Sequence, residues 1–309
     1  MEKLEADNVD RDEVGRPVKN LLSPRSAFML LLGSAAHELW HFSRLPKARK
    51  VPPGTLQYDC NICGRPNAVD LTAMERESRT CLGCGSTLRH RSVVAALSRK
   101  LFAGRSLPLD EWEGVDALKV TGVSDAELIA RALGQKVAYT NTFFHQAPFL
   151  DICAPAPEYF SSCDVLVCSD VLEHVPPPVD RAFEGMRKVI RPGGFLLMTV
   201  PCTALERTAE HYPDLHEYRI IERDGRSVLV NRTAEGRIEE FDDLVFHGGP
   251  GETLEMRLFA MNDLERNLRR AGFSAIEICA QPDFRHGVYW QRPYDVPVVA
   301  SVPGGGPGA

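Results

Sequence analysis

The sequence lacks a membrane-length apolar run, an excess of basic residues and an export signal. The longest apolar run, residues 27–36, is about half the length that spans a bilayer. Acidic residues outnumber basic ones by 42 to 36, so the chain offers no basic face for non-specific nucleic-acid binding. Its first thirteen residues contain more acids than bases, whereas a secretory signal begins with a positively charged region. We therefore expect a cytoplasmic protein with no membrane association and no nucleic-acid partner.

The nine cysteines are an odd number, and four of them form two tight pairs. Cys60 and Cys63 make one Cys-x₂-Cys knuckle, and Cys81 and Cys84 make the other. Two such knuckles can surround one zinc ion with four thiolates at about 2.3 Å, which leaves no position for water. The spacing predicts a structural zinc ribbon in a reducing compartment. The alternative is four free cysteines that pair by chance.

A second metal pattern comes earlier, where His37, Glu38 and His41 match H-E-x-x-H. On a helix this pattern can place two histidines on one zinc ion beside a general base. A catalytic site also needs a third protein ligand, and Asp59 is the only acid between His41 and the first knuckle. Because a proline-rich linker follows at once, we interpret the pattern as a chance match and not as a zinc peptidase.

The remaining sequence divides into four parts. Residues 1–50 read as a disordered tail and an amphipathic helix, and residues 51–105 as the ribbon and a linking helix. From residue 117 to 200, short apolar runs alternate with helical patterns, which indicates an α/β domain with a doubly wound, Rossmann-like parallel sheet. We assign this domain to residues 106–300 with a polar insertion at 203–257, and residues 301–309 to a flexible tail.

Residues 163–201 carry the most informative pattern of the chain. An apolar strand ends at Ser169 and Asp170, a loop with Glu173 and His174 follows, and a helix then leads through Arg-Pro-Gly-Gly into another apolar strand. The carboxyl ends of the strands line the ligand crevice of a doubly wound sheet, so these polar residues should lie at its mouth. The alternative is an ordinary helix-to-strand turn and a loop histidine without function.

This ordered string resembles class I S-adenosylmethionine-dependent methyltransferases. Asp164, residues 171–174 and the turn at 191–194 match the motifs of that family. The similarity extends over about 117–280, with residues 264–278 as the last helix and strand of the sheet. The cysteine knuckles ahead of the domain resemble a subgroup with a small zinc ribbon. The resemblance implies a seven-stranded sheet preceded by the ribbon, with S-adenosylmethionine and a structural Zn²⁺ as cofactors.

The resemblance also implies a set of cofactor-binding residues. The first strand-to-helix turn, usually glycine-rich, keeps only Gly122, followed by Ser124 and Asp125. The second strand ends in Asn141, where the family normally has an acid for the ribose hydroxyls. The expected cofactor contacts are Gly122, Ser124, Asp125, Asn141, Asp151, Ile152, Ser169 and Asp170. Capping of the next helix is the alternative role for Ser124 and Asp125.

The implied reaction is in-line transfer of the sulfonium methyl, which requires an aligned acceptor and, for a hydroxyl or amine, a nearby base. Candidates for the base are Asp170 and His174 at the crevice mouth. In the insertion, His247, Glu255 and Arg257 could face the acceptor, with His247 as a further catalytic candidate. Residues 217–233 read as a hairpin around Asp224 and Gly225. The insertion could equally be a surface hairpin without function.

The acidic chain favours a small-molecule, sugar or peptide acceptor, and Arg89 and Arg91 could tie the ribbon to carboxylates of the main domain. Two alternatives remain open: a non-catalytic scaffold with this fold, and an enzyme that transfers or cleaves another part of S-adenosylmethionine.

Overall fold

The computed structural model describes residues 54–247, 253–292 and 295–304. Its centre is a six-stranded sheet in the order β15-β16-β6-β5-β3-β4. Strands β3, β4, β5 and β6 of this sheet run parallel to one another. Strand β16 pairs antiparallel with β6, and β15 pairs antiparallel with β16 at the edge. The strands are β3 (Lys119–Val123), β4 (Ala138–Thr142), β5 (Cys163–Ser169), β6 (Ile190–Thr199), β15 (Ser274–Ile278) and β16 (Val298–Ser301).

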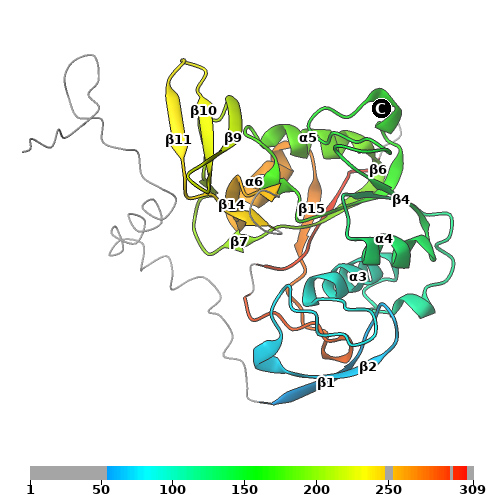
Figure 1. Cartoon of the computed structure of the whole chain (residues 1–309). Helices are drawn as coiled ribbons and strands as arrows, with labels where there is room; N and C mark the ends of the chain where they lie inside the picture. The colour runs from blue at the N-terminus through cyan, green and yellow to red at the C-terminus, as the bar shows by residue number, and fades with distance from the viewer. Residues whose placement is uncertain (1–53, 248–252, 293–294, 305–309) are drawn as a thin grey trace, which may run out of the picture.

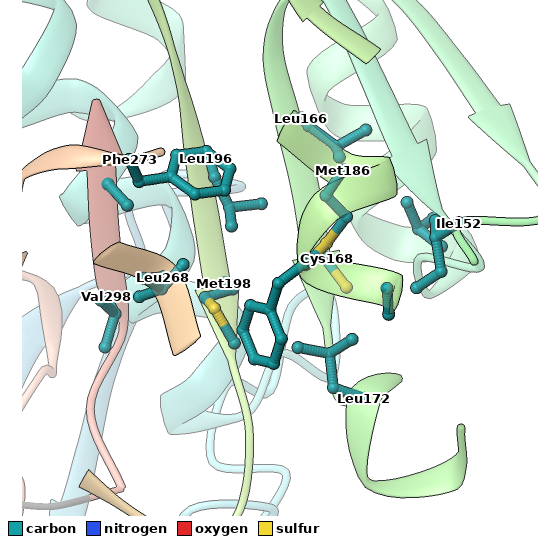
Figure 2. Close-up of a cluster of buried hydrophobic side chains, with 14 of the residues drawn as sticks. Ile152, Leu166, Cys168, Leu172, Met186, Leu196, Met198, Leu268, Phe273 and Val298 are labelled. Carbon is teal, nitrogen blue, oxygen red and sulfur yellow. The ribbon is translucent and has the colours of Figure 1, made fainter. Parts of the chain in front are cut away.

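Helices cover both faces of this sheet (Figure 1). On one face, α3 (Leu88–Leu101) and α4 (Glu127–Gly134) share an apolar cluster with the sheet. On the other face, α5 (Asp180–Val189) and α6 (Met261–Arg270) do the same. Strand β5 is buried from Cys163 to Cys168, so its side chains supply both clusters. Figure 2 shows one of them, with Leu166 and Cys168 of β5 among the residues drawn. These features confirm the predicted α/β fold.

The predicted count of seven strands is not confirmed. In the described residues, the segment between β4 and β5 contains one bridge, between Phe143 and Phe149, and the short helix η3 (Pro157–Tyr159). A βαβ crossover needs at least about ten residues that can form a helix. This segment is interrupted by prolines at 148, 155 and 157, so a further helix and strand do not form.

Sequence reasoning also missed the last strand. The segment 274–280 was expected to complete the sheet, but β16 inserts between β15 and β6. It ends at Ser301, inside the segment expected to be a flexible tail, and the amide of Val302 donates to the carbonyl of Gly194. Because the apolar run at 298–300 is short and is soon followed by glycines, the sequence pattern did not indicate a strand there.

The ribbon lies beyond α3, at the opposite end of the molecule from the insertion hairpin (Figure 1). It contains β1 (Thr55–Asp59), β2 (Pro66–Asp70) and the short helix η1 (Leu71–Ala73). Tyr58 and Met74 pack into one cluster with Tyr289 and Trp290 from the far end of the chain. Fully buried Arg91 donates to the carbonyls of Ser86 and Gly287 and therefore fixes the ribbon to the main domain.

Residues 202–260 form small strands beside the sheet. Their strands are β7 (Cys202–Thr203), β8 (Ala209–Glu210), β9 (Glu217–Arg223), β10 (Arg226–Arg232), β11 (Ile238–Phe241), β12 (Phe246–His247), β13 (Thr253–Leu254) and β14 (Arg257–Ala260). The predicted hairpin turns at Asp224 and Gly225, both with positive φ, as a two-residue turn of this kind requires. The short helices η2 (Leu109–Glu111), η4 (Leu172–His174) and η5 (Phe284–His286) complete the fold.

Within the described ranges, none of the helices combines the length and apolar character of a membrane span. The H-E-x-x-H pattern at residues 37–41 lies outside the described residues.

Candidate functional site

The four ribbon cysteines converge on one point. The Sγ atoms of Cys60 and Cys84 lie 3.8 Å apart, those of Cys63 and Cys81 lie 3.6 Å apart, and all four fall within 4.8 Å of one another. Tetrahedral bonds of about 2.3 Å to one zinc ion would hold the sulfurs about 3.8 Å apart. Gly64 and Gly85, with φ of 72° and 71°, make the turns after each knuckle. The geometry therefore fits a closed four-thiolate site.

Side chains of the protein fill the space beside the turn that follows β3. A Cβ at Gly122 would collide with the Tyr139 hydroxyl, which donates a 2.6 Å hydrogen bond to Asp125. Asp125 is 6% exposed, and its burial raises its pKa to about 7, although the hydrogen bond from Tyr139 acts in the opposite direction. Gly122 thus makes room for Tyr139, a role that its place in the cofactor motif did not predict.

Asn141, at the end of β4, is tied to the same turn. Its amide oxygen accepts from the Asp125 backbone N–H at 3.0 Å, and its amide nitrogen donates to the Asp125 carbonyl at 2.9 Å. Ser124 lies between Gly122 and Asp125 in the turn and is exposed, with φ of 53°. Its N–H donates to the Thr142 carbonyl. The structure therefore brings Gly122, Ser124, Asp125 and Asn141 together. Asp125 and Asn141 form hydrogen bonds with each other.

Asp151 and Ile152 follow the loop that leads away from β4. A carboxylate oxygen of Asp151 accepts from the Cys153 N–H at 2.8 Å and closes a tight turn. Ile152 is 5% exposed and belongs to the apolar cluster that contains Cys168 and Met186 (Figure 2). The backbone of Ile152 also contacts Gly185 of α5 so closely that a Cβ there would collide with the Ile152 carbonyl.

Asp170 is held by two arginines from the ribbon side of the molecule. Both guanidinium Nη atoms of Arg76 donate to its carboxylate, at 2.6 and 2.5 Å, and the Nε of Arg89 lies 3.1 Å away. Burial alone would raise the pKa of Asp170, but the hydrogen bonds and charge of Arg76, with the charge of Arg89, lower it to about 2. Asp170 is therefore an anion in a fixed position, and is not a free base.

Ser169 and Thr199 extend this network across two strands. The Ser169 hydroxyl accepts from Arg89 at 2.7 Å and is 2.8 Å from the Thr199 hydroxyl, which in turn donates to Asp170. Glu77, half-exposed, pairs with both arginines at 2.7 Å. The ribbon loop and the carboxyl end of β5 consequently form one hydrogen-bonded unit.

A cluster of acids and histidines is built on η4, which carries Glu173 and His174. His174 and His247 lie with their rings perpendicular and their centroids 4.7 Å apart, and Glu173 is 3.8 Å from a nitrogen of each. Glu255 accepts from His247 at 2.8 Å and from His211 at 3.0 Å. Two of the three predicted catalytic residues, 73 positions apart in sequence, are thus brought together, while Asp170 belongs to the arginine network.

The environment differs between the two histidines. Burial lowers the pKa of His174, whereas the hydrogen bond to Glu255 raises the pKa of His247. Burial alone would raise the pKa of Glu255, but the hydrogen bonds from His211 and His247 lower it to about 2. His247 is the more accessible of the pair, with 37% of its side chain exposed against 15% for His174.

Arg257 fixes the loop that carries the cluster. It is fully buried, donates to the carbonyls of Leu172 and Val175 at 2.7 and 2.6 Å, and pairs with Glu210 at 2.8 Å. Sequence reasoning suggested an acceptor contact for this residue, but here its guanidinium binds protein groups. Reasoning from sequence also missed Arg76, Tyr139 and His211, because each acts through a partner distant in the chain.

The comparisons with known proteins identify the domain. The family described as "Methyltransferase domain" matches residues 103–198, and no curated protein sequence matches.

Among solved structures, the Burkholderia thailandensis 1,6-didemethyltoxoflavin-N1-methyltransferase shares 13% identity, with 69% of this chain and 78% of that chain covered and a TM-score of 0.36. A sugar N-methyltransferase from Streptoalloteichus sp shares 13%, with 71% and 89% covered and a TM-score of 0.41. Similarities this distant say nothing about the acceptor. The family match shows a methyltransferase domain over residues 103–198, the part of the chain that contains β3, β4, β5 and nearly all of β6.

Proposed function

We propose that the protein transfers the methyl group of S-adenosylmethionine to a small-molecule, sugar or peptide acceptor. The observation that carries this proposal is the pair His247–Glu255, beside the loop that follows β5. Glu255 accepts the Nε2 proton of His247, which leaves the Nδ1 lone pair free on a partly exposed ring. A histidine oriented by a carboxylate in this way can remove a proton from a hydroxyl or amine acceptor.

The cofactor would bind along the carboxyl ends of β3, β4 and β5. Bound there, it supplies an activated methyl group, and the protein aligns the acceptor and excludes water. Ser124, Asp151 and Ser169 have polar atoms on this edge, and Asp170 lies beside them as an anion paired with Arg76 and Arg89. Asn141 and Asp125 would contribute by holding the shape of the turn.

The ribbon would hold one structural zinc ion through Cys60, Cys63, Cys81 and Cys84. A closed four-thiolate site has no position for water, so the metal would stabilise the fold and take no part in the reaction. Arg76 lies in the loop between the two knuckles, so the metal would also fix the arginine that binds Asp170.

A non-catalytic scaffold is the second candidate, and specific contacts favour it. Tyr139 occupies the space next to Gly122, and Arg76 and Arg89 neutralise Asp170. In a scaffold, these contacts would replace those of a cofactor. Transfer or cleavage of another part of S-adenosylmethionine would use the same edge and differs only in its products.

Calorimetric titration of the purified protein with S-adenosylmethionine and S-adenosylhomocysteine tests the proposal. We expect submillimolar binding of both. Asp151→Asn should keep the turn to Cys153 but weaken binding about tenfold, since a neutral amide replaces a charged acceptor. Asp180→Asn, in the first turn of α5, is the matched control and should bind like the wild type. Absence of binding to the wild type would leave the scaffold as the function.

A further inference from the structure

Glu173 is a buried carboxylate without a hydrogen-bond partner. Its side chain is 0% exposed, and neither carboxylate oxygen has a partner among the described residues. An isolated buried carboxylate costs several kcal/mol, so such a group in a native protein takes up a proton, pairs with a cation or binds a metal. No arginine or lysine of the described chain makes an ion pair with Glu173, in contrast to Asp170 three residues earlier.

Two imidazole nitrogens point toward this carboxylate. The Nδ1 atom of His174 donates to the Leu254 carbonyl at 2.8 Å, so its Nε2 atom carries the lone pair, 3.8 Å from Glu173 Oε1. The Nε2 atom of His247 donates to Glu255 at 2.8 Å, so its Nδ1 atom carries the lone pair, also 3.8 Å from Glu173 Oε1. Both lone pairs therefore approach the same carboxylate oxygen.

The separations suit a shared ion better than direct hydrogen bonds. A hydrogen bond between nitrogen and oxygen requires about 2.7–3.2 Å, which neither histidine achieves with Glu173. Two ligands bound to one metal at about 2.0–2.1 Å lie roughly 3–3.5 Å apart. The ligand atoms of Glu173, His174 and His247 fall within 4.8 Å of one another, so small rotations would close them around an ion.

The surroundings of the cluster also match those of a metal site. Metal-binding histidines usually donate their second ring N–H to a carboxylate or a backbone carbonyl, which fixes the tautomer and the ring. Here Glu255 and the Leu254 carbonyl accept those protons. Arg257 holds the carbonyls of Leu172 and Val175 on either side of Glu173 and His174, so the loop is fixed before any ion binds.

We propose that Glu173, His174 and His247 form a binding site for a divalent first-row transition metal, separate from the ribbon zinc. Two imidazoles and one carboxylate suit Zn²⁺, Fe²⁺ or Co²⁺, whereas Mg²⁺ and Ca²⁺ prefer oxygen ligands. Three protein ligands leave at least one coordination position open, which an oxygen or nitrogen of an acceptor could occupy. The site rests on its own contacts and does not depend on methyl transfer. An ion bound here would replace His247 as the base, because both roles need the same Nδ1 lone pair.

Metal titration of the full-length protein tests this site. After removal of weakly bound metal with a mild chelator, we expect the wild type to bind two equivalents of Zn²⁺, measured by elemental analysis after gel filtration. Glu173→Gln and His247→Ala should each bind one. A Cys60→Ser, Cys81→Ser double variant should lose the ribbon equivalent and retain the other. With Co²⁺, the equivalent lost in Glu173→Gln should show no thiolate charge-transfer band.

His211→Asn is the matched control, because His211 contacts the other oxygen of Glu255 but does not face Glu173. We expect it to bind two equivalents, with affinity reduced at most about tenfold, as for a group outside the ligand set. With only the ribbon zinc bound, Glu173→Gln should be at least as thermally stable as the wild type, which separates loss of a ligand from misfolding. A single equivalent in the wild type, or two in both Glu173→Gln and His247→Ala, would overturn the proposal.

Discussion

Arg76 holds both carboxylate oxygens of Asp170, at 2.6 and 2.5 Å, across 94 positions of sequence. The arginine comes from the loop between the two cysteine knuckles, and the aspartate directly follows β5. A bidentate pair of this kind fixes orientation as well as distance. The ribbon therefore shapes the edge of the sheet where the cofactor would bind.

Replacing Arg76 should destabilise the whole domain. In Arg76→Ala, Asp170 stays buried with only Arg89 and Thr199 as partners, so we expect a loss of about 2–4 kcal/mol in the free energy of unfolding. Urea denaturation followed by circular dichroism measures the change. Arg79→Ala, on the same loop but exposed, should match the wild type. Equal stability of the two variants would mean that the Arg76 pair contributes little.

Asp125 should give the protein a distinctive pH dependence. Its burial raises its pKa to about 7 in the folded state, against 3.8 as the usual value. Below pH 3.8 the group is protonated in both states. As the pH rises from 3.8 to 7, the unfolded state releases the proton first, and stability falls by up to about 4 kcal/mol.

Asp125→Asn removes this titration and keeps an acceptor for the Tyr139 hydroxyl. We expect the variant to gain stability relative to the wild type as the pH rises from 4 to 7, measured by urea denaturation at each pH. A difference between the two proteins that stays constant over this range would show that Asp125 titrates normally.

The packing of Tyr139 should by itself require glycine at position 122, whether or not a cofactor binds. Gly122→Ala places a Cβ against the Tyr139 hydroxyl and the Asp125 carboxylate, so we expect a loss of about 1–3 kcal/mol. Adding Tyr139→Val should recover part of this loss, measured against Tyr139→Val alone, because the smaller side chain vacates that space while the Asp125 carboxylate stays. Thermal denaturation of both variants measures this. No recovery in the double variant would show that the strain arises elsewhere.

Removing metal from the ribbon should loosen the end of β5. Chelation, or Cys60→Ser, takes away the ion that joins the two knuckles and frees the loop that carries Arg76. Hydrogen–deuterium exchange should therefore accelerate in residues 169–174 as well as in the ribbon. His37→Ala, outside the knuckles, should retain the ribbon zinc and show normal protection. Faster exchange confined to residues 55–90 would contradict coupling of the ribbon to the sheet.

The sequence alone predicted the features that depend on local spacing. The cysteine knuckles, the apolar strand that ends at Ser169 and the hairpin at Asp224 and Gly225 are each specified by residues close in the chain, and the structure contains all of them. The juxtaposition of His174 and His247 was only suggested, since it depends on how the insertion folds back over η4.

Other features could not be predicted because they arise from packing between distant segments. Whether Gly122 serves a cofactor or a neighbouring side chain depends on the Tyr139 rotamer, and no spacing rule gives that. The arginine that neutralises Asp170 comes from a loop with no motif. Strand β16 has only four residues, too few for its alternation to be recognised, and its place is fixed by pairing with β6 and β15.

A crystal structure of the protein with S-adenosylhomocysteine most directly tests whether this domain uses its cofactor edge. We predict that the nucleoside lies across the carboxyl ends of β3, β4 and β5, in contact with Ser124, Asp151 and Ser169, while the four thiolates bind zinc. An edge still filled by Tyr139, Arg76 and Arg89 at saturating nucleoside, with no ligand density, would contradict methyl transfer by this protein.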